Sequence, residues 1–248
     1  MKKHQFEHDL DHPLRTVEHR DLILSNKYLK KTYQEWYSHL LKALPEMEGD
    51  ILEIGSGGGF LKEMLPSVIT SDILPLDYCD ACFSAEKLPY SDKSLSAIMM
   101  VNVLHHIPNP ENFFSEAQRC LKPGGKILLI EPTSTPLSRF FYKKIHHEPF
   151  DDTAFWNLEP GSPLSNSNQA IPWIIMKRDR AKFDLLFPEL QLVKYQKLMP
   201  FNNVLSGGLS WHPLLPLWMY SVVRFFEVAF SPFVSLVGLF AFSIVEKK

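Results

Sequence analysis

A short apolar segment that runs into a cluster of glycines restricts the fold of this chain more than any other feature. Residues Ile51–Ile54 carry one charge, on Glu53, and lead directly into Gly55-Ser56-Gly57-Gly58-Gly59. A strand that is covered on both faces of a parallel sheet has this apolar character. Glycines at its carboxyl end permit a sharp turn and let a ligand approach the backbone closely. The segment therefore predicts an α/β fold with a ligand site at this edge of the sheet.

The rest of the chain alternates between strand-like and helix-like patterns, which indicates a mostly parallel sheet with helices on both faces. We expect strands at residues 67–71, 78–83, 95–101, 126–130 and 190–198. We expect one or two helices within residues 16–44, and others at 112–121, 173–187 and 214–230. Residues 1–13 are expected to form a loose arm. The segment 133–170 is rich in Pro, Ser, Asn and His, with weak periodicity, which is typical of a lid or substrate loop.

The length and composition of the chain limit the classes of protein to which it can belong. The 248 residues suit one domain, divided into an N-terminal helical cap (1–47), a cofactor-binding core (48–133) and a substrate loop with the end of the sheet (134–248). The formal net charge is −2 without a long run of Lys or Arg, so no nucleic-acid partner is expected. Three cysteines fit a reducing compartment, and Met1–His12 lacks the apolar core of a signal peptide. We therefore expect a cytoplasmic protein.

Two of the cysteines, Cys79 and Cys82, have the spacing of a redox or zinc motif. Such a motif needs a helix start or a second pair of ligands, and the sequence shows neither. We interpret them as two small residues in a short core strand.

Two acidic residues indicate which ligand the glycine turn binds. The dinucleotide fingerprint requires a third glycine where this chain has Phe60. Glu53 would repel a phosphate group, whereas a ligand that carries an ammonium and a sulfonium suits it. Asp72 lies 19 residues after Glu53, at the end of the second expected strand, where a carboxylate can accept hydrogen bonds from both hydroxyls of a ribose. Asp72 alone would fit a loop-start cap equally well, and the combination with the glycine turn favours ribose binding.

Five blocks between Ile51 and Pro132 occur in the order and spacing of a known family: ILEIGSGGGF, SDILP, SAEKLPYSDKSLSAI, VNVLHHIPNP and RCLKPGGKILLIEP. In these blocks the chain resembles the class I S-adenosylmethionine-dependent methyltransferases, and most closely their type 11 methyltransferase domain. The resemblance implies a three-layer Rossmann-like α/β sandwich. Its seven-stranded sheet would be mostly parallel with an antiparallel last strand, with N-terminal helices and extra helical or loop elements. It also implies S-adenosylmethionine as the cofactor.

The resemblance further assigns parts of this cofactor to residues of the chain. The first block would hold the methionine part, Asp72 the ribose, and the block after the third strand the adenine. The cofactor-binding residues are expected to be Glu53, Gly55, Ser56, Gly57, Gly59, Asp72, Ile73, Ala85, Glu86 and Asn102. The chain departs from the family at Ser84, where members usually have an Asp that binds the adenine amino group. The short segment between Asp72 and Cys79 also leaves little room for the usual crossover helix.

Histidines at the edge of the sheet are the candidates for catalysis. His105 and His106 follow the fourth strand at the carboxyl edge, and an imidazole is a suitable base near neutral pH. One of them is expected to act on the substrate, although either could instead pack or cap the turn at Pro108. Glu131, at the end of the fifth strand, would orient a histidine or contact substrate, or is a plain edge carboxylate.

A metal ion is the weaker interpretation of the acidic and histidine-rich segment further along. His146-His147-Glu148 and Asp151-Asp152 lie in the long loop. Residues adjacent in sequence do not point at one centre without a special fold, so we expect no metal site.

The apolar C-terminal region leaves two interpretations open. Val228–Val245 has 18 consecutive residues without a charge, which is the threshold for a membrane-spanning helix. Pro232 and Gly238 interrupt it, so we favour a buried helix followed by a last strand at 236–245. The apolar side chains from Trp211 onward would also allow a peripheral membrane contact, or a cover over a lipid-like or aromatic acceptor.

These features together predict an enzyme that transfers a methyl group from S-adenosylmethionine to an oxygen, nitrogen or carbon nucleophile of a small or lipid-like acceptor. One alternative is a non-catalytic or membrane-associated interaction protein that retained the fold, which the Ser84 departure favours. The other alternative is a nicotinamide-dependent oxidoreductase. It is disfavoured because Phe60 replaces the third glycine of the dinucleotide fingerprint and Glu53 would repel a phosphate group.

Overall fold

The computed structural model describes residues 3–146, 148–159 and 161–248. Seven strands form one sheet in the order β3-β2-β1-β4-β5-β7-β6. The strands are β1 (Asp50–Ile54), β2 (Ile69–Asp72), β3 (Ala81–Cys82), β4 (Leu95–Val101), β5 (Leu121–Pro132), β6 (Leu190–Leu198) and β7 (Phe240–Lys247). Neighbours from β3 to β5 pair in parallel, whereas β7 lies antiparallel between β5 and β6. The predicted Rossmann-like sheet with its antiparallel last strand is confirmed.

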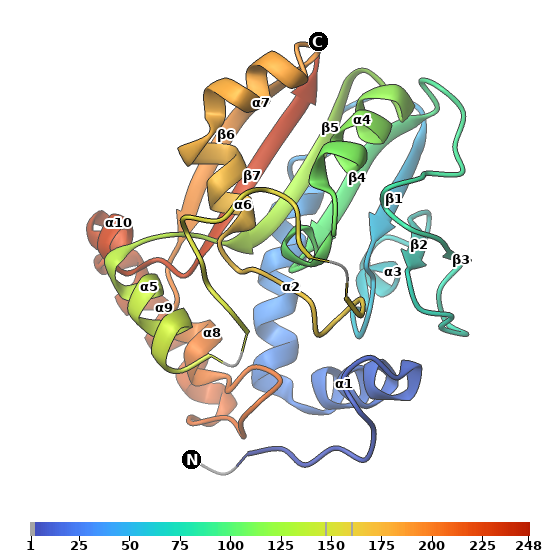
Figure 1. Cartoon of the computed structure of the whole chain (residues 1–248). Coiled ribbons are helices and arrows are strands. Elements are labelled where there is room, and N and C mark those ends of the chain that lie inside the picture. The colour runs from blue at the N-terminus through green and yellow to red at the C-terminus, as the bar shows by residue number, and fades with distance from the viewer. Residues whose placement is uncertain (1–2, 147, 160) are drawn as a thin grey trace.

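Helices cover both faces of this sheet. The N-terminal helices are α1 (Pro13–Ser25) and α2 (Lys27–Leu41), followed by α3 (Leu61–Met64) and α4 (Pro110–Cys120). Next come α5 (Pro136–Lys144), α6 (Ile171–Trp173) and α7 (Arg180–Leu186), and a π-helical turn at Ile174–Arg178 joins the last two. The last helices are α8 (Phe201–Leu205), α9 (Tyr220–Ala229) and α10 (Val234–Val237). In Figure 1, α1 lies below the carboxyl edge of the parallel strands, and α5, α9 and α10 gather at the left.

The alternation of side chains along β5 divides the core into two layers. Ile127 and Leu129 point to the face that α4, α6 and α7 cover, whereas Leu128 and Ile130 point to the face that α2 covers. Successive residues of a strand point to opposite faces, so a strand with two apolar faces must be covered on both. This is why the central strands read as uninterrupted apolar runs in the sequence.

The predicted bounds hold for two strands, the buried central strand β4 and the edge strand β6. β5 begins five residues earlier than the predicted 126, because Pro123-Gly124-Gly125 lies inside the strand rather than ending the preceding helix. The interpretation of Cys79 and Cys82 as core-strand residues is wrong. The edge strand β3 spans two residues, Cys79 precedes it and is half-buried, and Cys82 is exposed.

The segments outside the sheet differ more from the prediction. The expected loop 133–170 contains α5, whose start is a capping box between Thr135 and Ser138 followed by Pro136. The expected N-terminal arm is not loose, because Lys3 pairs with Trp211 in a β-bridge. The expected helix 214–230 has its α-helical part from Tyr220 to Ala229, and the last strand starts at Phe240 rather than 236.

Residues 16–44 form two helices because Asn26 separates them. Its side chain accepts hydrogen bonds from the backbone N–H groups of Tyr28 and Leu29, which caps the start of α2. Among the described residues no single helix has the length and apolar character to cross a membrane. The consecutive pair Leu217–Ala229 and Ser231–Val237 meets the length and composition test jointly, with a bend of 65° between the two parts.

Replacing Phe114 tests the packing of α4 against α7. Phe114 is fully buried, and its ring centroid lies 5.0 Å from that of Phe183 and 5.6 Å from that of Phe187. Because truncation leaves a cavity there, Phe114→Ala should lower the free energy of unfolding by about 3–5 kcal/mol in urea denaturation. The control Phe225→Ala changes a largely exposed ring and should cost under about 0.5 kcal/mol. Equal effects of the two substitutions would contradict this packing.

Candidate functional site

The glycine turn at the carboxyl end of β1 owes its glycines to close packing as well as to backbone conformation. Gly55 has φ +65° and Gly57 has φ +47°. A side chain at Gly55 would collide with that of Val103, and one at Gly59 with the hydroxyl of Tyr37. At Gly57 a Cβ atom would meet no atom closer than 3.7 Å, so space remains beside this backbone position.

Two buried carboxylates flank this turn. Ser56 Oγ donates a hydrogen bond of 2.8 Å to Glu53 Oε2. The Gly57 N–H donates one of 2.9 Å to Asp72 Oδ2, and the Leu74 N–H donates one of 2.9 Å to Asp72 Oδ1. Burial raises the pKa of Glu53 to about 7, against the hydrogen bond from Ser56, and the negative charge of Asp72 raises it further. Burial raises the pKa of Asp72 as well.

Helix α1 packs directly on the glycine turn, which the sequence did not predict. A Cβ atom at Gly58 would come within 2.9 Å of the backbone nitrogen of Arg20. The Arg20 guanidinium donates a hydrogen bond to Gly59 O and lies 4.6 Å from the centre of the Tyr78 ring. Between these groups lies a cavity of about 30 Å³. A drug-sized ligand occupies several hundred Å³, so the structure leaves little free space for a ligand between α1 and the glycine turn.

Several polar atoms around the turn lack a protein partner. Thr16 Oγ1, Tyr78 Oη and Asn102 Oδ1 are buried and form no hydrogen bond with any described residue. Buried polar atoms are normally paired, so these three mark places for polar ligand atoms. Asn102 was expected at the site. Thr16 and Tyr78 were missed, and nothing in their own sequence context distinguishes them.

The remaining expected cofactor residues lie further along the same sheet edge. Ile73 follows β2 and is exposed, with 44% of its surface accessible. Ala85 and Glu86 are half-buried in a turn after β3, where the Ser84 hydroxyl accepts a hydrogen bond from the Glu86 N–H. The structure therefore brings Glu53, Ser56, Gly57 and Asp72 together, and leaves the expected adenine residues at the edge.

Glu131 fixes the turn that carries the histidines. Its Oε1 accepts hydrogen bonds from the N–H groups of Val103 (2.7 Å) and Leu104 (2.8 Å), and its Oε2 lies 2.8 Å from His105 Nδ1. Because Glu131 is only 2% exposed, all of its contacts are with protein. Glu131 thus links the end of β5 to the single 3₁₀ turn Leu104–His106 that follows β4, and it orients His105.

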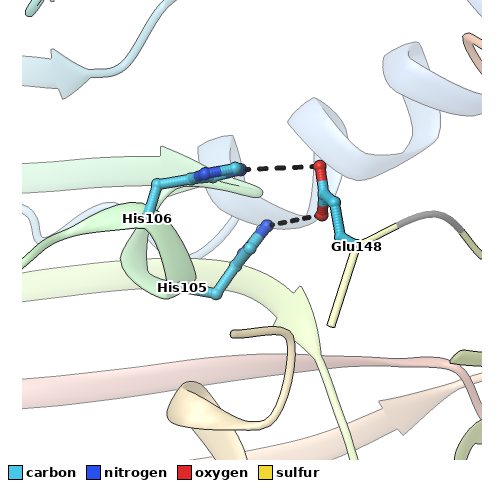
Figure 2. A group of neighbouring side chains, drawn as sticks. All are labelled: His105, His106 and Glu148. Atoms are coloured by element: carbon cyan, nitrogen blue, oxygen red, sulfur yellow. Dashed lines mark ion pairs between the residues drawn. The ribbon is translucent and has the colours of Figure 1, made fainter. Parts of the chain in front are cut away.

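A third group, Glu148, reaches the two histidines from the segment after α5. Figure 2 shows both imidazoles pointing toward its carboxylate. His105 Nε2 lies 3.6 Å from Glu148 Oε2, and His106 Nε2 lies 3.9 Å from Glu148 Oε1. Gln169 Nε2 donates a hydrogen bond to Glu148, and His106 Nδ1 lies 3.3 Å from Asn166 O. Sequence reasoning considered Glu148 only together with its own neighbours and did not join it to His105 and His106.

Burial and charge push the pKa values of the two histidines in opposite directions. Burial acts to lower the pKa of His105, but the carboxylates of Glu131 and Glu148 outweigh it and raise that pKa. Burial and the neighbouring His105 lower the pKa of His106. Burial would raise the pKa of Glu148, yet the histidines hold it well below its usual range. Such opposed shifts are common where groups have a chemical task.

A larger cavity, of about 300 Å³, lies between α2, the end of β6 and α9, away from the glycine turn. Its buried acid, Glu227, accepts hydrogen bonds from the backbone and side-chain nitrogens of Asn202 and forms an ion pair with Arg224. The protein itself therefore satisfies this acid, and the chemistry is concentrated at the edge formed by β1, β2, β4 and β5.

Comparison with known proteins shows the family of this chain. A family model described as a methyltransferase domain matches residues 25–174. Among curated proteins, a demethylmenaquinone methyltransferase of Tropheryma whipplei (strain Twist) is 46% identical over 44 residues, which are 18% of each chain. A ubiquinone/menaquinone biosynthesis C-methyltransferase of Bordetella avium is 39% identical over 59 residues, covering 24% of this chain and 22% of that protein. The matches thus span about a fifth of the length of these relatives.

Two solved structures share the fold. A SAM-dependent methyltransferase from Thermotoga maritima is 19% identical, with a TM-score of 0.56, over 95% of this chain and 98% of that chain. A SAM-dependent methyltransferase from Archaeoglobus fulgidus is 18% identical, with a TM-score of 0.50, over 87% of this chain and 94% of that chain.

The raised pKa of Glu53 predicts that cofactor affinity depends on pH. If Glu53 is the residue that binds the ammonium group of S-adenosylmethionine, its ionised form attracts that group and its protonated form does not. Affinity measured by calorimetry should therefore rise with pH up to about 7, with a change of about tenfold per pH unit below that value. Glu53→Gln should bind more weakly and lose this dependence between pH 5.5 and 7. A wild-type affinity that is constant over this range would contradict the assignment.

Proposed function

The chain belongs to the methyltransferase domain family, with S-adenosylmethionine as its cofactor, and we propose that it methylates an oxygen, nitrogen or carbon nucleophile of a small or lipid-like acceptor. The observation that carries this proposal is the pair of buried carboxylates, Glu53 and Asp72, on either side of the glycine turn. Family membership also sets aside the nicotinamide-dependent oxidoreductase alternative.

The residues at the turn fit S-adenosylmethionine. Two buried acids form no ion pair with any described residue, and a ligand with an ammonium and a sulfonium would offset the cost of burying their charge. We propose that Glu53 binds the ammonium and Asp72 the ribose hydroxyls. The unpartnered oxygens of Thr16, Tyr78 and Asn102 supply further hydrogen-bond positions. When bound, the cofactor supplies a methyl group activated by a sulfonium.

The acceptor side of the site consists of His105, His106 and Glu148. They lie at the end of β4, beside the carboxyl end of β1 where the glycine turn begins. A methyl acceptor must be held in line with the sulfonium, and a hydroxyl or ammonium acceptor must also lose a proton. His105 is almost fully buried and fixed by Glu131, whereas the side chain of His106 is 17% exposed. We therefore assign contact with the acceptor to His106 and the orienting role to His105 and Glu131.

An apolar and basic surface on α5, α9 and α10 supports a lipid-like acceptor. Helix α5 packs against α10, which follows α9 after a 3₁₀ turn (Figure 1). We give the name apolar face to the exposed apolar side chains of these helices and of the turns next to them, which are Leu137, Phe140, Ile145, Leu217, Trp218, Val222, Phe225, Phe226, Val228, Phe230, Phe233 and Leu236. Apolar patches of this kind mark interaction sites for proteins or membranes.

The charges around the apolar face favour a membrane over a protein as its partner. Helix α5 carries Arg139, Lys143 and Lys144 and no acid, although Arg139 and Lys143 form ion pairs with Asp152, and the only acid of α9, Glu227, is buried. Exposed apolar side chains next to basic ones fit the surface of an anionic bilayer. The curated relatives are named as methyltransferases of quinone biosynthesis, which supports an apolar acceptor. The segment after α5 carries Glu148, so the apolar face is continuous in sequence with the acceptor side of the site.

Calorimetry and methyl transfer test the function together. The protein should bind S-adenosylmethionine and S-adenosylhomocysteine but not NAD⁺, and it should transfer radiolabelled methyl groups to a prenylated hydroquinone or into a bacterial lipid extract. His106→Ala should lower turnover by about 10²-fold or more, with an unchanged Kd for the cofactor. Binding of NAD⁺ in place of the two cofactor forms, or full activity of His106→Ala, would overturn these assignments.

Vesicle sedimentation tests the apolar face. The protein should sediment with vesicles of phosphatidylglycerol, and the double substitution Phe225→Ser with Phe226→Ser should abolish this, because it removes two exposed rings from the face. The control Leu185→Ser removes an exposed apolar side chain on α7, outside the face, and should leave sedimentation unchanged. If the two variants behave alike, the apolar face is not the contact surface.

A further inference from the structure

Three side chains on the acceptor side of the site converge on one point. One possible ligand atom from each of His105, His106 and Glu148 lies within 4.8 Å of the other two. The histidines come from the turn after β4, and Glu148 comes from the segment after α5, 42 positions further along the chain. Figure 2 shows that the two imidazoles and the carboxylate face the same space.

The Nδ1 atom of each imidazole already faces a hydrogen-bond acceptor. Asn166 O can only accept, so the His106 Nδ1 that lies 3.3 Å away must carry the hydrogen. Glu131 already accepts two backbone N–H groups at Oε1, and its Oε2 lies 2.8 Å from His105 Nδ1, which is the donor there. In their neutral forms, both histidines therefore direct a lone pair on Nε2 toward Glu148.

A positive charge fits between these groups, and in the metal-free protein a proton on His105 supplies it, because Glu131 and Glu148 raise the pKa of His105. The distances of 3.6 Å and 3.9 Å from Nε2 to Glu148 are longer than ordinary hydrogen bonds. They are close to the separation of about 3.4 Å between two ligands of a tetrahedral ion that binds each at about 2.0–2.2 Å. Small side-chain rotations would complete such a coordination.

We propose that His105, His106 and Glu148 bind one divalent transition-metal ion, with zinc as the representative, and that Glu131 positions His105 as a ligand. Two imidazoles and a carboxylate are a common ligand set for such ions. A carboxylate that accepts the other N–H of a ligating histidine is a recurring part of these sites. Gln169 donates a hydrogen bond to Glu148 and fixes the third ligand in the same way.

The site leaves coordination positions for the acceptor, and this role rests on the proposed function. A hydroxyl group of the acceptor that binds the ion becomes more acidic, so its O–H bond breaks and the proton passes to solvent. The resulting oxygen anion is the nucleophile that the methyl transfer needs. The substrate class that follows is an acceptor with a hydroxyl or enol oxygen next to an apolar body.

The other cluster of histidine and carboxylates in the described part of the chain lacks these properties. Glu7, His8 and Glu18 also lie within 4.8 Å of one another. There His8 Nδ1 pairs directly with Glu18 at 2.7 Å, so the ring and the acid satisfy each other without an ion. This cluster lies at the surface near the N-terminus and provides a matched control.

Metal binding to the full-length protein, stripped with a chelator and dialysed, tests the proposal. Titration with Zn²⁺ in a calorimeter should show one equivalent bound. Co²⁺ should bind in its place and produce visible absorption typical of four or five ligands. His106→Ala and Glu148→Gln should weaken binding at least 100-fold, Glu131→Gln should weaken it about 10–100-fold, and the control His8→Ala should have no effect. A circular dichroism spectrum and the Kd for S-adenosylmethionine show whether each variant is folded.

The outcomes separate this proposal from the proposed function. If the wild-type protein binds no stoichiometric Zn²⁺ or Co²⁺, or if His106→Ala and Glu148→Gln bind them as tightly as wild type, the metal site is wrong even when methyl transfer is intact. If the metal binds as expected while S-adenosylmethionine does not, the metal site stands and the proposed function fails.

Discussion

The buried carboxylate of Glu131 holds the functional edge of this protein together. It accepts two backbone N–H groups from the turn after β4 and contacts His105 with its other oxygen, all between 2.7 and 2.8 Å. These contacts join the ends of two neighbouring parallel strands at the edge where such sheets bind ligands. A buried carboxylate is tolerated because every one of its oxygens has a donor. As a consequence, the position of His105 depends on the single side chain of Glu131. The geometry of the acceptor side depends on it in turn.

The cofactor side differs, because its two buried acids accept hydrogen bonds but form no ion pair with any described residue. Glu53 and Asp72 lie at the carboxyl ends of the neighbouring strands β1 and β2, and burial raises the pKa of both. A protein that buries two such groups without an ion pair loses stability until a cationic ligand arrives. This relation links stability to cofactor binding, because a ligand that binds only the folded state stabilises it.

The sequence predicted the elements and site residues that depend on local patterns. It did not predict the contacts between residues that are distant in the sequence. The strands β4 and β6, the glycine turn with Glu53 and Asp72, and the histidine pair were all found, because period, glycine spacing and strand ends are local signals. Glu148 was not joined to His105 and His106, because its approach depends on α5, which was taken for loop. The capping box at Thr135 and Ser138 was the available signal for α5, and the Pro- and Ser-rich composition obscured it. No local signal could place Arg20 and Thr16 of α1 over the glycine turn, because that contact is purely tertiary.

The N-terminal arm connects the two sides of the site. Through Arg20, helix α1 binds the glycine turn, and just before α1 the carboxylate of Asp11 accepts hydrogen bonds from the N–H groups of Leu164 and Ser165. The next residue, Asn166, holds His106 through its carbonyl oxygen. The N-terminal arm therefore contacts both the glycine turn of the cofactor side and the segment that orients His106 on the acceptor side.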